Sequence, residues 1–259
     1  MIELENLSVS CSNIEYLTIN WTIADTTESL DDYEIIILRS GSPDSGFIEL
    51  DSISPSDYLY DDYAANLRSD WRKFHYKLKV INTVTEDEED FGPVSLQEEP
   101  DPISKTIINK HKLALRKFSG VICKLLIRKN SGFRCSVCWD PIKRRKTVSS
   151  CDNCYGTGFE GGFFNPISIY VDFQPSAEVV EWVDFGKLEP NETISLTSNT
   201  PLLTPGDVIV RVKDNQRWII NDIRPRKFRA SSAGTVVLIQ VLRVGSVNKN
   251  DVIYRLDVS

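Results

Sequence analysis

Arg134-Cys-Ser-Val-Cys138 and Cys151-Asp-Asn-Cys154-Tyr-Gly-Thr-Gly158 are the stretch that decides how the middle of this chain folds. Two Cys-x-x-Cys motifs this close together are typical of four thiolates that surround one tetrahedral metal ion. Thiolates are soft ligands that suit Zn²⁺, and the residues between the two motifs are enough for a short hairpin. The spacing therefore predicts that Cys135, Cys138, Cys151 and Cys154 bind a structural Zn²⁺.

The residues around these motifs predict a zinc ribbon over 131–165 with no catalytic role, because all four ligands come from the protein. Gly156 and Gly158 let the backbone turn tightly, with its amides directed at the sulfurs. Two disulfides, an iron–sulfur centre and a redox dithiol are the alternative chemistries, and the spacing favours zinc. Cys11 and Cys123 belong to no such motif and are predicted to be buried thiols.

Charge is divided unevenly along the 259 residues. Residues 1–101 carry 6 Lys+Arg and 23 Asp+Glu, whereas residues 102–259 carry 24 and 14. Between Lys105 and Lys146 there are 13 basic residues and a single acidic one, Asp140. The two parts of the chain are therefore predicted to have different partners.

The basic residues culminate in a cluster between the two cysteine motifs, formed by Lys143, Arg144, Arg145 and Lys146. Such a cluster attracts a nucleic-acid backbone, and it equally suits an acidic protein surface. Both partners remain open. Base-specific recognition is not expected, because no helix is evident that would enter a groove.

Residues 1–100 alternate β-branched and aromatic runs with turn residues, which predicts an acidic β-sandwich. The expected strands are Ile2–Ser10, Tyr16–Ile23, Tyr33–Ser40, Phe47–Ile53, His75–Asn82 and Pro93–Gln97. The acidic run Glu86–Asp90 is expected in a solvated loop.

Residues 101–130 are predicted to be a linker whose helix begins at Asp101-Pro102 and reaches about Phe118. An apolar stripe with three- and four-residue spacing runs along it, formed by Ile108, Leu115, Phe118, Ile122 and Leu125. The stripe either packs against the C-terminal domain or contacts a neighbouring subunit. Gly120 interrupts it, and periodicity does not decide whether Val121–Arg128 is a helix or a strand.

Residues 166–259 are predicted to form a small barrel or sandwich, so the whole chain is expected to be mainly β and multidomain. The expected strands are Ile167–Phe173, Val179–Phe185, Thr193–Thr197, Asp207–Val212, Gln216–Ile223, Thr235–Val244 and Val252–Asp257. Asp214-Asn215 marks a tight hairpin, and Arg224–Arg229 is expected to be a basic loop.

No constellation of catalytic residues emerges from the sequence, and the protein is predicted not to be an enzyme. The two histidines, His75 and His111, lie in separate expected elements, and no phosphate-binding glycine loop precedes a helix. There is no N-terminal signal and no apolar run of membrane-spanning length. We expect a soluble intracellular product or part of an assembly built there, with no small-molecule substrate.

Three sets of residues carry a resemblance to known families. Trp21, Tyr76 and Gly92-Pro93 lie where a fibronectin type III domain has its second-strand Trp, its corner Tyr and its last strand. Leu203-Thr-Pro-Gly-Asp-Val-Ile-Val210 and Arg217-Trp-Ile-Ile-Asn-Asp-Ile223 resemble head-closure barrels. The helix and the cysteine motifs lie between the N-terminal and C-terminal β regions. This order of modules resembles that of neck proteins of tailed-bacteriophage virions.

The neck resemblance implies a ring-forming head–tail connector in the virion, assembled in the host cytoplasm. Its partners would be copies of itself, portal and tail proteins, and the DNA backbone in the channel, with no membrane and no catalytic step. The alternative is a zinc-ribbon protein that binds nucleic acid. Cys151–Gly158 also resembles one repeat of the cysteine-rich domain of DnaJ-type chaperones, but Cys135–Cys138 is followed by Trp-Asp and departs from that repeat.

Overall fold

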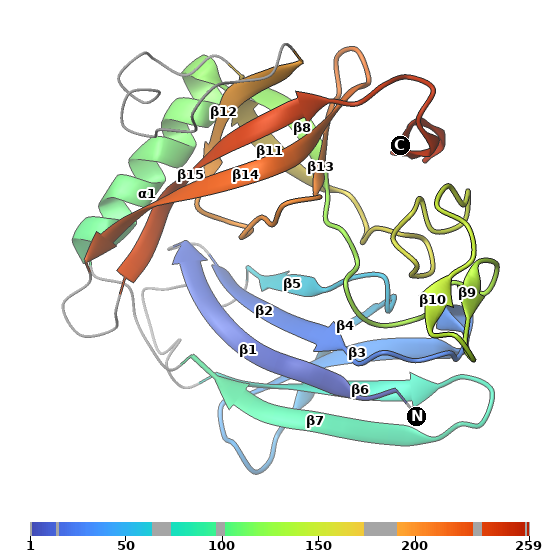
Figure 1. The fold of residues 1–259 in the computed structure, drawn as a ribbon. Helices are drawn as coiled ribbons and strands as arrows, with labels where there is room; N and C mark the ends of the chain where they lie inside the picture. The colour runs from blue at the N-terminus through green and yellow to red at the C-terminus, as the bar shows by residue number, and fades with distance from the viewer. Residues whose placement is uncertain are drawn as a thin grey trace. The chain divides into compact units, whose positions relative to one another are not determined.

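The computed structural model describes residues 2–13, 16–63, 74–96, 102–173, 191–229, 235–256 and 258. These residues are mainly β, as the sequence predicts. They divide into two compact units: the first consists of Met1–Glu99 and Lys129–Phe164, and the second of Pro100–Arg128 and Asn165–Ser259. The cysteine segment (129–164) therefore belongs to the same unit as the acidic N-terminal residues (Figure 1).

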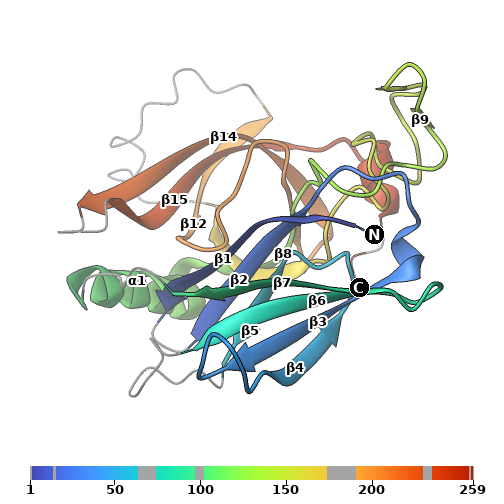
Figure 2. The ribbon, with the colours of Figure 1, turned by 90° about the horizontal axis from the view of Figure 1, so that it is seen from below.

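Two antiparallel sheets form most of the first unit. The strands of the sheet with order β1-β2-β5 are β1 (Leu4–Asn13), β2 (Tyr16–Ile23) and β5 (Leu59–Asp62). The strands of the sheet with order β4-β3-β6-β7 are β3 (Tyr33–Ser40), β4 (Ile48–Ile53), β6 (His75–Asn82) and β7 (Glu88–Ser95). Figure 2 shows the strands of this second sheet side by side.

One apolar core is shared by both sheets of the first unit. Every second residue of β3 and β6 is buried along most of each strand, because side chains alternate between the faces of a sheet. Trp21 of β2 and Tyr76 of β6 are among the largest fully buried side chains. Phe133 of the cysteine segment lies in the same core.

The bounds of β2, β3 and β6 agree with the predicted strands. The strand β5 was not predicted, and the expectation that Glu86–Asp90 is a loop is wrong for Glu88–Asp90, which begin β7. β7 lies at the edge of its sheet, where charged side chains can point into solvent. Such charges also prevent the exposed strand from pairing with a strand of another chain.

Six antiparallel strands of the second unit close into a barrel with the order β11-β12-β15-β14-β13-β8. They are β8 (Val121–Leu126), β11 (Ile167–Asp172), β12 (Glu192–Ser198), β13 (Val208–Arg211), β14 (Gln216–Arg229) and β15 (Thr235–Ser246). Closure leaves no free sheet edge in the barrel. Its core includes Cys123, Leu125, Ile209 and Leu242, so the prediction that Cys123 is buried is confirmed, as it is for Cys11 in the first unit.

The helix α1 (Pro102–Ala114) and a π turn (Leu115–Ser119) precede β8. The predicted helix is thus confirmed, and the open choice for the residues after Gly120 is decided as a strand. α1 lies against β12 and β15 (Figure 1). Among the described residues, no helix combines the length and the apolar character needed to cross a membrane.

The expectation of a basic loop at Arg224–Arg229 is wrong, because these residues belong to β14. Arg224 pairs with Val241 and Arg226 with Ile239 of β15. The partner strand is long enough to continue the ladder, and ladder hydrogen bonds depend on the backbone, whatever the charge of the side chains.

The last predicted strand is also wrong: Val252–Arg255 forms a 3₁₀ helix. Asp251 caps it, because its side chain accepts a hydrogen bond from the Ile253 amide at 3.0 Å. The buried Arg217 donates to the carbonyls of Ile253 and Leu256, which holds this short helix on the barrel. The strand predicted over 179–185 lies outside the described residues.

Candidate metal centre

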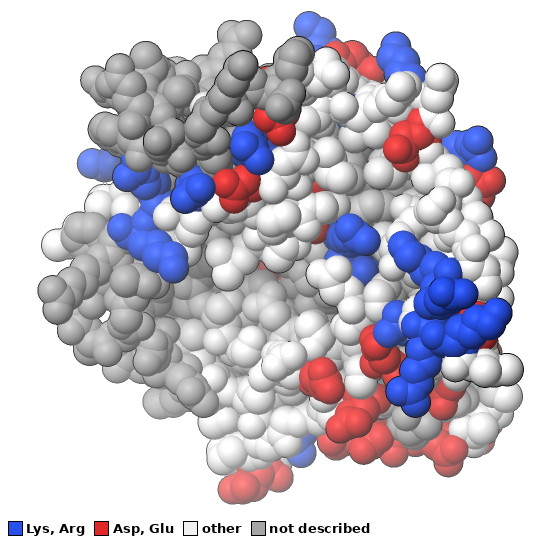
Figure 3. All heavy atoms as spheres, in the orientation of Figure 1, with Lys and Arg blue, Asp and Glu red and all other residues white. Residues whose placement is uncertain are grey.

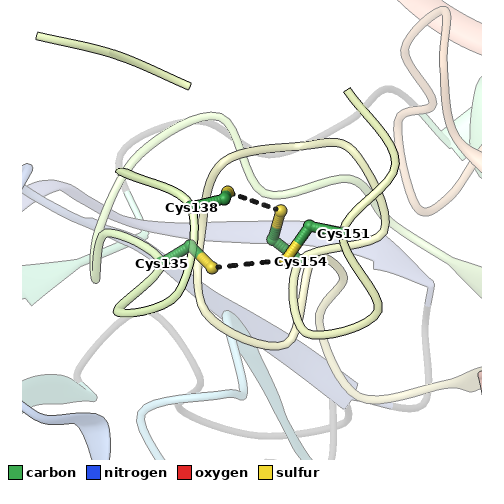
Figure 4. Close-up of side chains that lie close together, drawn as sticks. All are labelled: Cys135, Cys138, Cys151 and Cys154. Carbon is green, nitrogen blue, oxygen red and sulfur yellow. Dashed lines mark hydrogen bonds between the residues drawn. The ribbon is translucent and has the colours of Figure 1, made fainter. Parts of the chain in front are cut away.

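The four predicted ligands, Cys135, Cys138, Cys151 and Cys154, come together as a buried cluster (Figure 4). Their sulfur atoms all lie within 4.8 Å of one another, with Cys138 Sγ 3.4 Å from Cys154 Sγ and Cys135 Sγ 4.0 Å from Cys151 Sγ. A disulfide needs about 2.05 Å, and all four cysteines are free. Four sulfurs bound tetrahedrally to Zn²⁺ at about 2.3 Å lie about 3.8 Å apart, so the cluster suits one metal ion.

A two-stranded hairpin joins the two cysteine motifs. β9 (Trp139–Asp140) pairs with β10 (Arg145–Lys146), and the Thr147 amide then donates to the Cys138 carbonyl at 2.8 Å. The Cys135 amide donates to the Gly158 carbonyl at 3.0 Å, which ties the first motif to the loop after the second. The backbone therefore holds both motifs in register around one point.

Gly156 and Gly158 have φ of 81° and 91°, so the tight turn expected after the second motif is present. The amides that reach the sulfurs belong to other residues, however. Cys135 Sγ accepts hydrogen bonds from the backbone of Val137 and Cys138. In the second motif, the backbone of Asn153 and Cys154 donates to Cys151 Sγ in the same way. This is the geometry of a knuckle, in which the loop between two cysteines wraps its own amides around the first sulfur.

Burial and the neighbouring groups shift the pKa values of the clustered thiols in opposite directions. Burial raises the pKa of Cys138, and hydrogen bonds with Cys154 and Cys135 raise it further. Burial also raises the pKa of Cys135, whereas at Cys151 burial is outweighed by backbone hydrogen bonds and the pKa is lowered. Four thiolates this close repel one another unless a bound cation neutralises them, in which case metal binding releases the thiol protons.

Asn153 and Glu160, which no sequence motif indicates, support the cluster from outside. Asn153 Nδ2 lies 3.6 Å from Cys135 Sγ and donates to Glu160 Oε1 at 2.8 Å. Glu160 Oε2 accepts from the Ser136 amide at 3.2 Å. The two motifs are thereby cross-linked through one carboxylate. No spacing rule marks these two residues, because they meet through the folded loops.

The cysteine segment is tied to the sheets of the first unit immediately before its first ligand. Phe133 is 3% exposed and pairs with Thr26 in an isolated parallel bridge. The Arg134 amide donates to the Thr26 carbonyl at 2.7 Å, and the Arg134 guanidinium forms an ion pair with Asp25. The Gly132 amide donates to Asp25 Oδ1 at 3.2 Å. The cysteine cluster is therefore attached to the core of the first unit through consecutive residues.

The basic cluster (Lys143–Lys146) forms the tip and return of the β9–β10 hairpin, where Figure 3 shows Lys and Arg side chains gathered beside Asp and Glu. Asp140 Oδ1 accepts from the amides of Ile142 and Lys143, both at 3.0 Å, which fixes the turn. Lys146 donates to the Gly156 carbonyl and packs on Gly158, so it links the hairpin to the loop after the second cysteine motif. Arg144 and Arg145 are exposed, and no described carboxylate pairs with them.

Lys129 is a buried cation at the start of the cysteine segment. It is 5% exposed, and its Nζ donates to the Glu160 carbonyl at 2.8 Å. Burial lowers the pKa of Lys129 to about 8, and the carboxylates of Glu160 and Asp57 oppose this shift. The stability of the first unit should therefore depend on pH through this lysine.

We expect the free energy of unfolding of the wild type to rise above about pH 8 relative to that of Lys129→Met. Between its folded pKa of about 8 and its ordinary 10.5, Lys129 holds more protons in the unfolded chain than in the folded one. Raising the pH across this window therefore favours the folded state, by on the order of 2 kcal/mol at pH 10. Urea titrations at pH 7 to pH 10 test this, with the exposed Lys143→Met as control; parallel wild-type and Lys129→Met curves would contradict it.

A scan against protein-family models finds no matching family, and a search of curated proteins finds no significant match. The fold and the site define a mainly β protein with a closed barrel and a four-cysteine cluster suited to a metal ion.

Proposed function

We propose that this chain is a structural, ring-forming adaptor of a tailed-bacteriophage neck, which joins portal and tail around the DNA channel and has no catalytic step. The observation that carries the proposal is the closed six-stranded barrel. The two segments that resemble head-closure barrels supply its strand β13 and the first half of β14. These pair directly, with Val208 opposite Ile219 and Val210 opposite Arg217.

The loop before β13 is held rigidly, which suits a protein whose task is to position its neighbours. Asp207 is fully buried, and its carboxylate accepts from the amides of Arg128 at 2.8 Å and Thr204 at 2.7 Å. Gly206 has φ of 99°, a conformation that favours glycine. This carboxylate thus links the end of β8 to the loop that enters β13.

The proposal includes a fibronectin type III-like sandwich at residues 1–100. It is supported by the strand orders β1-β2-β5 and β4-β3-β6-β7, and by the buried Trp21 on β2. Tyr76 at the start of β6 is also buried, although its hydroxyl bonds to the Asp62 carboxylate at 2.8 Å and not to a backbone carbonyl, as a tyrosine corner would. Domains of this type usually act as spacers or adhesion modules.

The proposal also takes the metal to be Zn²⁺, held by Cys135, Cys138, Cys151 and Cys154. Four thiolates around a single point suit a tetrahedral d¹⁰ ion, and such closed sites are structural. The ribbon is too short to bury a core of its own, so a metal would supply the rigidity that packing does not.

Quantitative mass spectrometry of purified particles from the source tests the proposed function. A fixed copy number of about six or twelve is expected, because closed rotational symmetry sets the number of subunits in a ring. Absence of the protein from purified particles would overturn the proposal.

A zinc-ribbon nucleic-acid-binding protein is the second candidate, and the exposed cations of the hairpin tip favour it. In that case, replacing Lys143, Arg144 and Arg145 with glutamine should weaken binding to duplex DNA. The slope of log affinity against log salt should fall by about 0.9 for each phosphate that the variant no longer neutralises. Fluorescence anisotropy between low and physiological salt measures both effects, with Lys249→Gln as control. Equal affinities for the triple variant and the wild type would exclude this role for the cluster.

A further inference from the structure

The apolar stripe predicted on the linker helix contains both buried and exposed residues. Ile108 and Leu115 are each 2% exposed, and α1 and the π turn lie against strands of their own barrel. Phe118 and Ile122, in contrast, are 87% and 45% exposed. Leu125, the last residue of the stripe, is also buried. Three of the five residues are thus covered within the second unit, and the described residues leave Phe118 and Ile122 open to solvent.

The exposure of Phe118 is built into the backbone. In an α-helix, Leu115 and Phe118 would share one face, because residues three apart are neighbours on its surface. The Gly120 amide instead donates to the Leu115 carbonyl at 2.9 Å, the i to i+5 bond of a π turn, which widens the coil. Leu115 remains in the core while Phe118 is turned outward. Single π turns of this kind occur frequently at functional sites.

The π turn that carries Phe118 lies against β11, beside further apolar groups of the barrel surface. Ile122 on β8 is paired with Tyr170 on β11, so their side chains share one face. The Val212 amide donates to the Ile122 carbonyl at 3.3 Å, and Val212 is 52% exposed. A Cβ on Gly120 would lie 3.2 Å from Tyr170 Cβ, which brings the π turn next to this pair. We call Phe118, Ile122, Tyr170 and Val212 the apolar patch.

Exposed cations border the apolar patch. Arg116 and Lys117 precede Phe118 on the π turn, and Lys213 follows Val212. The second unit as a whole carries 18 Lys+Arg and 12 Asp+Glu in residues 100–128 and 165–259. The matching surface is therefore one that presents an apolar side chain among carboxylates.

The turn between β6 and β7 presents such a surface. Residues 83–90, which we call the acidic hairpin, are all exposed; they include five consecutive acids at Glu86–Asp90, and Val84 is 70% exposed. Asn82 makes the turn rigid, because its Oδ1 accepts from the amides of Val84 at 2.9 Å and Thr85 at 3.0 Å. Protection of an edge strand accounts for the charges at Glu88–Asp90, but not for an apolar side chain in the turn.

We propose that the acidic hairpin of one copy of this chain docks on the apolar patch of the next copy. The two surfaces are different parts of the chain, so the contact is heterologous, and a heterologous contact closes into a ring when its rotation allows. Apolar groups would meet at the centre, with opposite charges around them. This proposal rests on the ring-forming function above and names the contact that would build the ring.

Replacement of Phe118 tests the centre of the contact. Phe118→Ser should raise the dissociation constant of self-association about tenfold or more, as for other central aromatic residues of interfaces. Because Phe118 is 87% exposed, the variant should unfold at the wild-type urea concentration. Sedimentation velocity over a range of concentrations measures the association. Ile142→Ser is the matched control, since Ile142 is an exposed apolar residue of the cysteine segment. Equal weakening by both variants would overturn the proposal.

Charge reversal tests the pairing itself. Lys117→Glu and Glu86→Lys should each weaken self-association, and both effects should shrink at high salt. An equimolar mixture of the two variants should regain the wild-type assembly, because every contact then joins a patch and a hairpin of opposite charge. Misfolding of either variant would not be repaired by mixing. Two weakened variants that stay dissociated when mixed would overturn the proposed contact.

The contact and the proposed function fail in distinguishable ways. Wild-type protein that stays monomeric at every concentration overturns the contact, whereas absence from purified particles overturns the neck function. Particles that incorporate Phe118→Ser at the wild-type copy number would reject this contact and leave the ring function standing.

Discussion

Cys151→Ser should abolish metal binding and destabilise the whole first unit, including the sheets that lie far from the cysteines in the sequence. The serine removes one of four ligands, and a structural zinc site contributes about 10–16 kcal/mol of apparent binding free energy in small zinc domains. This exceeds what the short cysteine segment can supply by packing. The segment should therefore unfold locally.

Unfolding of the cysteine segment should reach the sandwich core through Phe133 and Arg134. Phe133 is part of that core, and loss of a buried Phe side chain destabilises by about 3–5 kcal/mol. Arg134 also loses its ion pair with Asp25 and its backbone bond to Thr26. The second unit contains none of these residues, so its barrel should keep its stability.

Metal content by inductively coupled plasma mass spectrometry and hydrogen exchange by mass spectrometry test both parts of this prediction. Bound zinc should fall from about one per chain to near zero, with faster exchange in β2 and β3 and unchanged exchange in β14 and β15. Ser150→Ala, at an exposed neighbouring position, is the control. Wild-type protein that folds without metal would contradict the site, and unchanged exchange in β2 and β3 would contradict the coupling.

Asp62→Ala should destabilise the first unit by about 3–5 kcal/mol, because it breaks a buried ionic network. Asp62 is 3% exposed and accepts from Tyr76 Oη at 2.8 Å and from Arg39 Nη1 at 2.7 Å. Burial raises the pKa of Tyr76 far above its ordinary value, and the bond to Asp62 raises it further, so the hydroxyl stays protonated and needs an acceptor. The alanine would leave the buried Tyr76 hydroxyl and the partly buried Arg39 guanidinium without this carboxylate.

Urea unfolding of Asp62→Ala and of the neighbouring Asp61→Ala measures the effect. Asp61 accepts from Thr18 Oγ1 at 2.7 Å at a partly buried site, so its loss should be smaller, at about 1 kcal/mol. Asp62→Asn should fall between the two, because it keeps an acceptor for Tyr76 and loses the charge that faces Arg39. Equal destabilisation by Asp61→Ala and Asp62→Ala would contradict the importance of the network.

The cysteine cluster and most strands were predictable because their signals are local. Two residues between cysteines are enough to define a metal knuckle, and the four predicted ligands do meet within 4.8 Å. Runs of β-branched and aromatic residues between turn residues predicted the bounds of β2, β3 and β6. Arg224–Arg229 and Glu88–Asp90 were misassigned because their strand conformation depends on a neighbouring strand, a fact that their own polar side chains do not reveal.

The sequence alone indicated which four cysteines form the cluster that could hold a metal ion, where most strands lie and how charge is distributed along the chain. Only the tertiary structure decided that Phe133 joins the sandwich core, that Asn153 and Glu160 brace the cysteines, and that Phe118 is exposed while Leu115 is buried. The physical reason is that spacing and alternation are set by neighbours along the chain. Whether an apolar or polar side chain finds a partner depends on residues that only folding brings near.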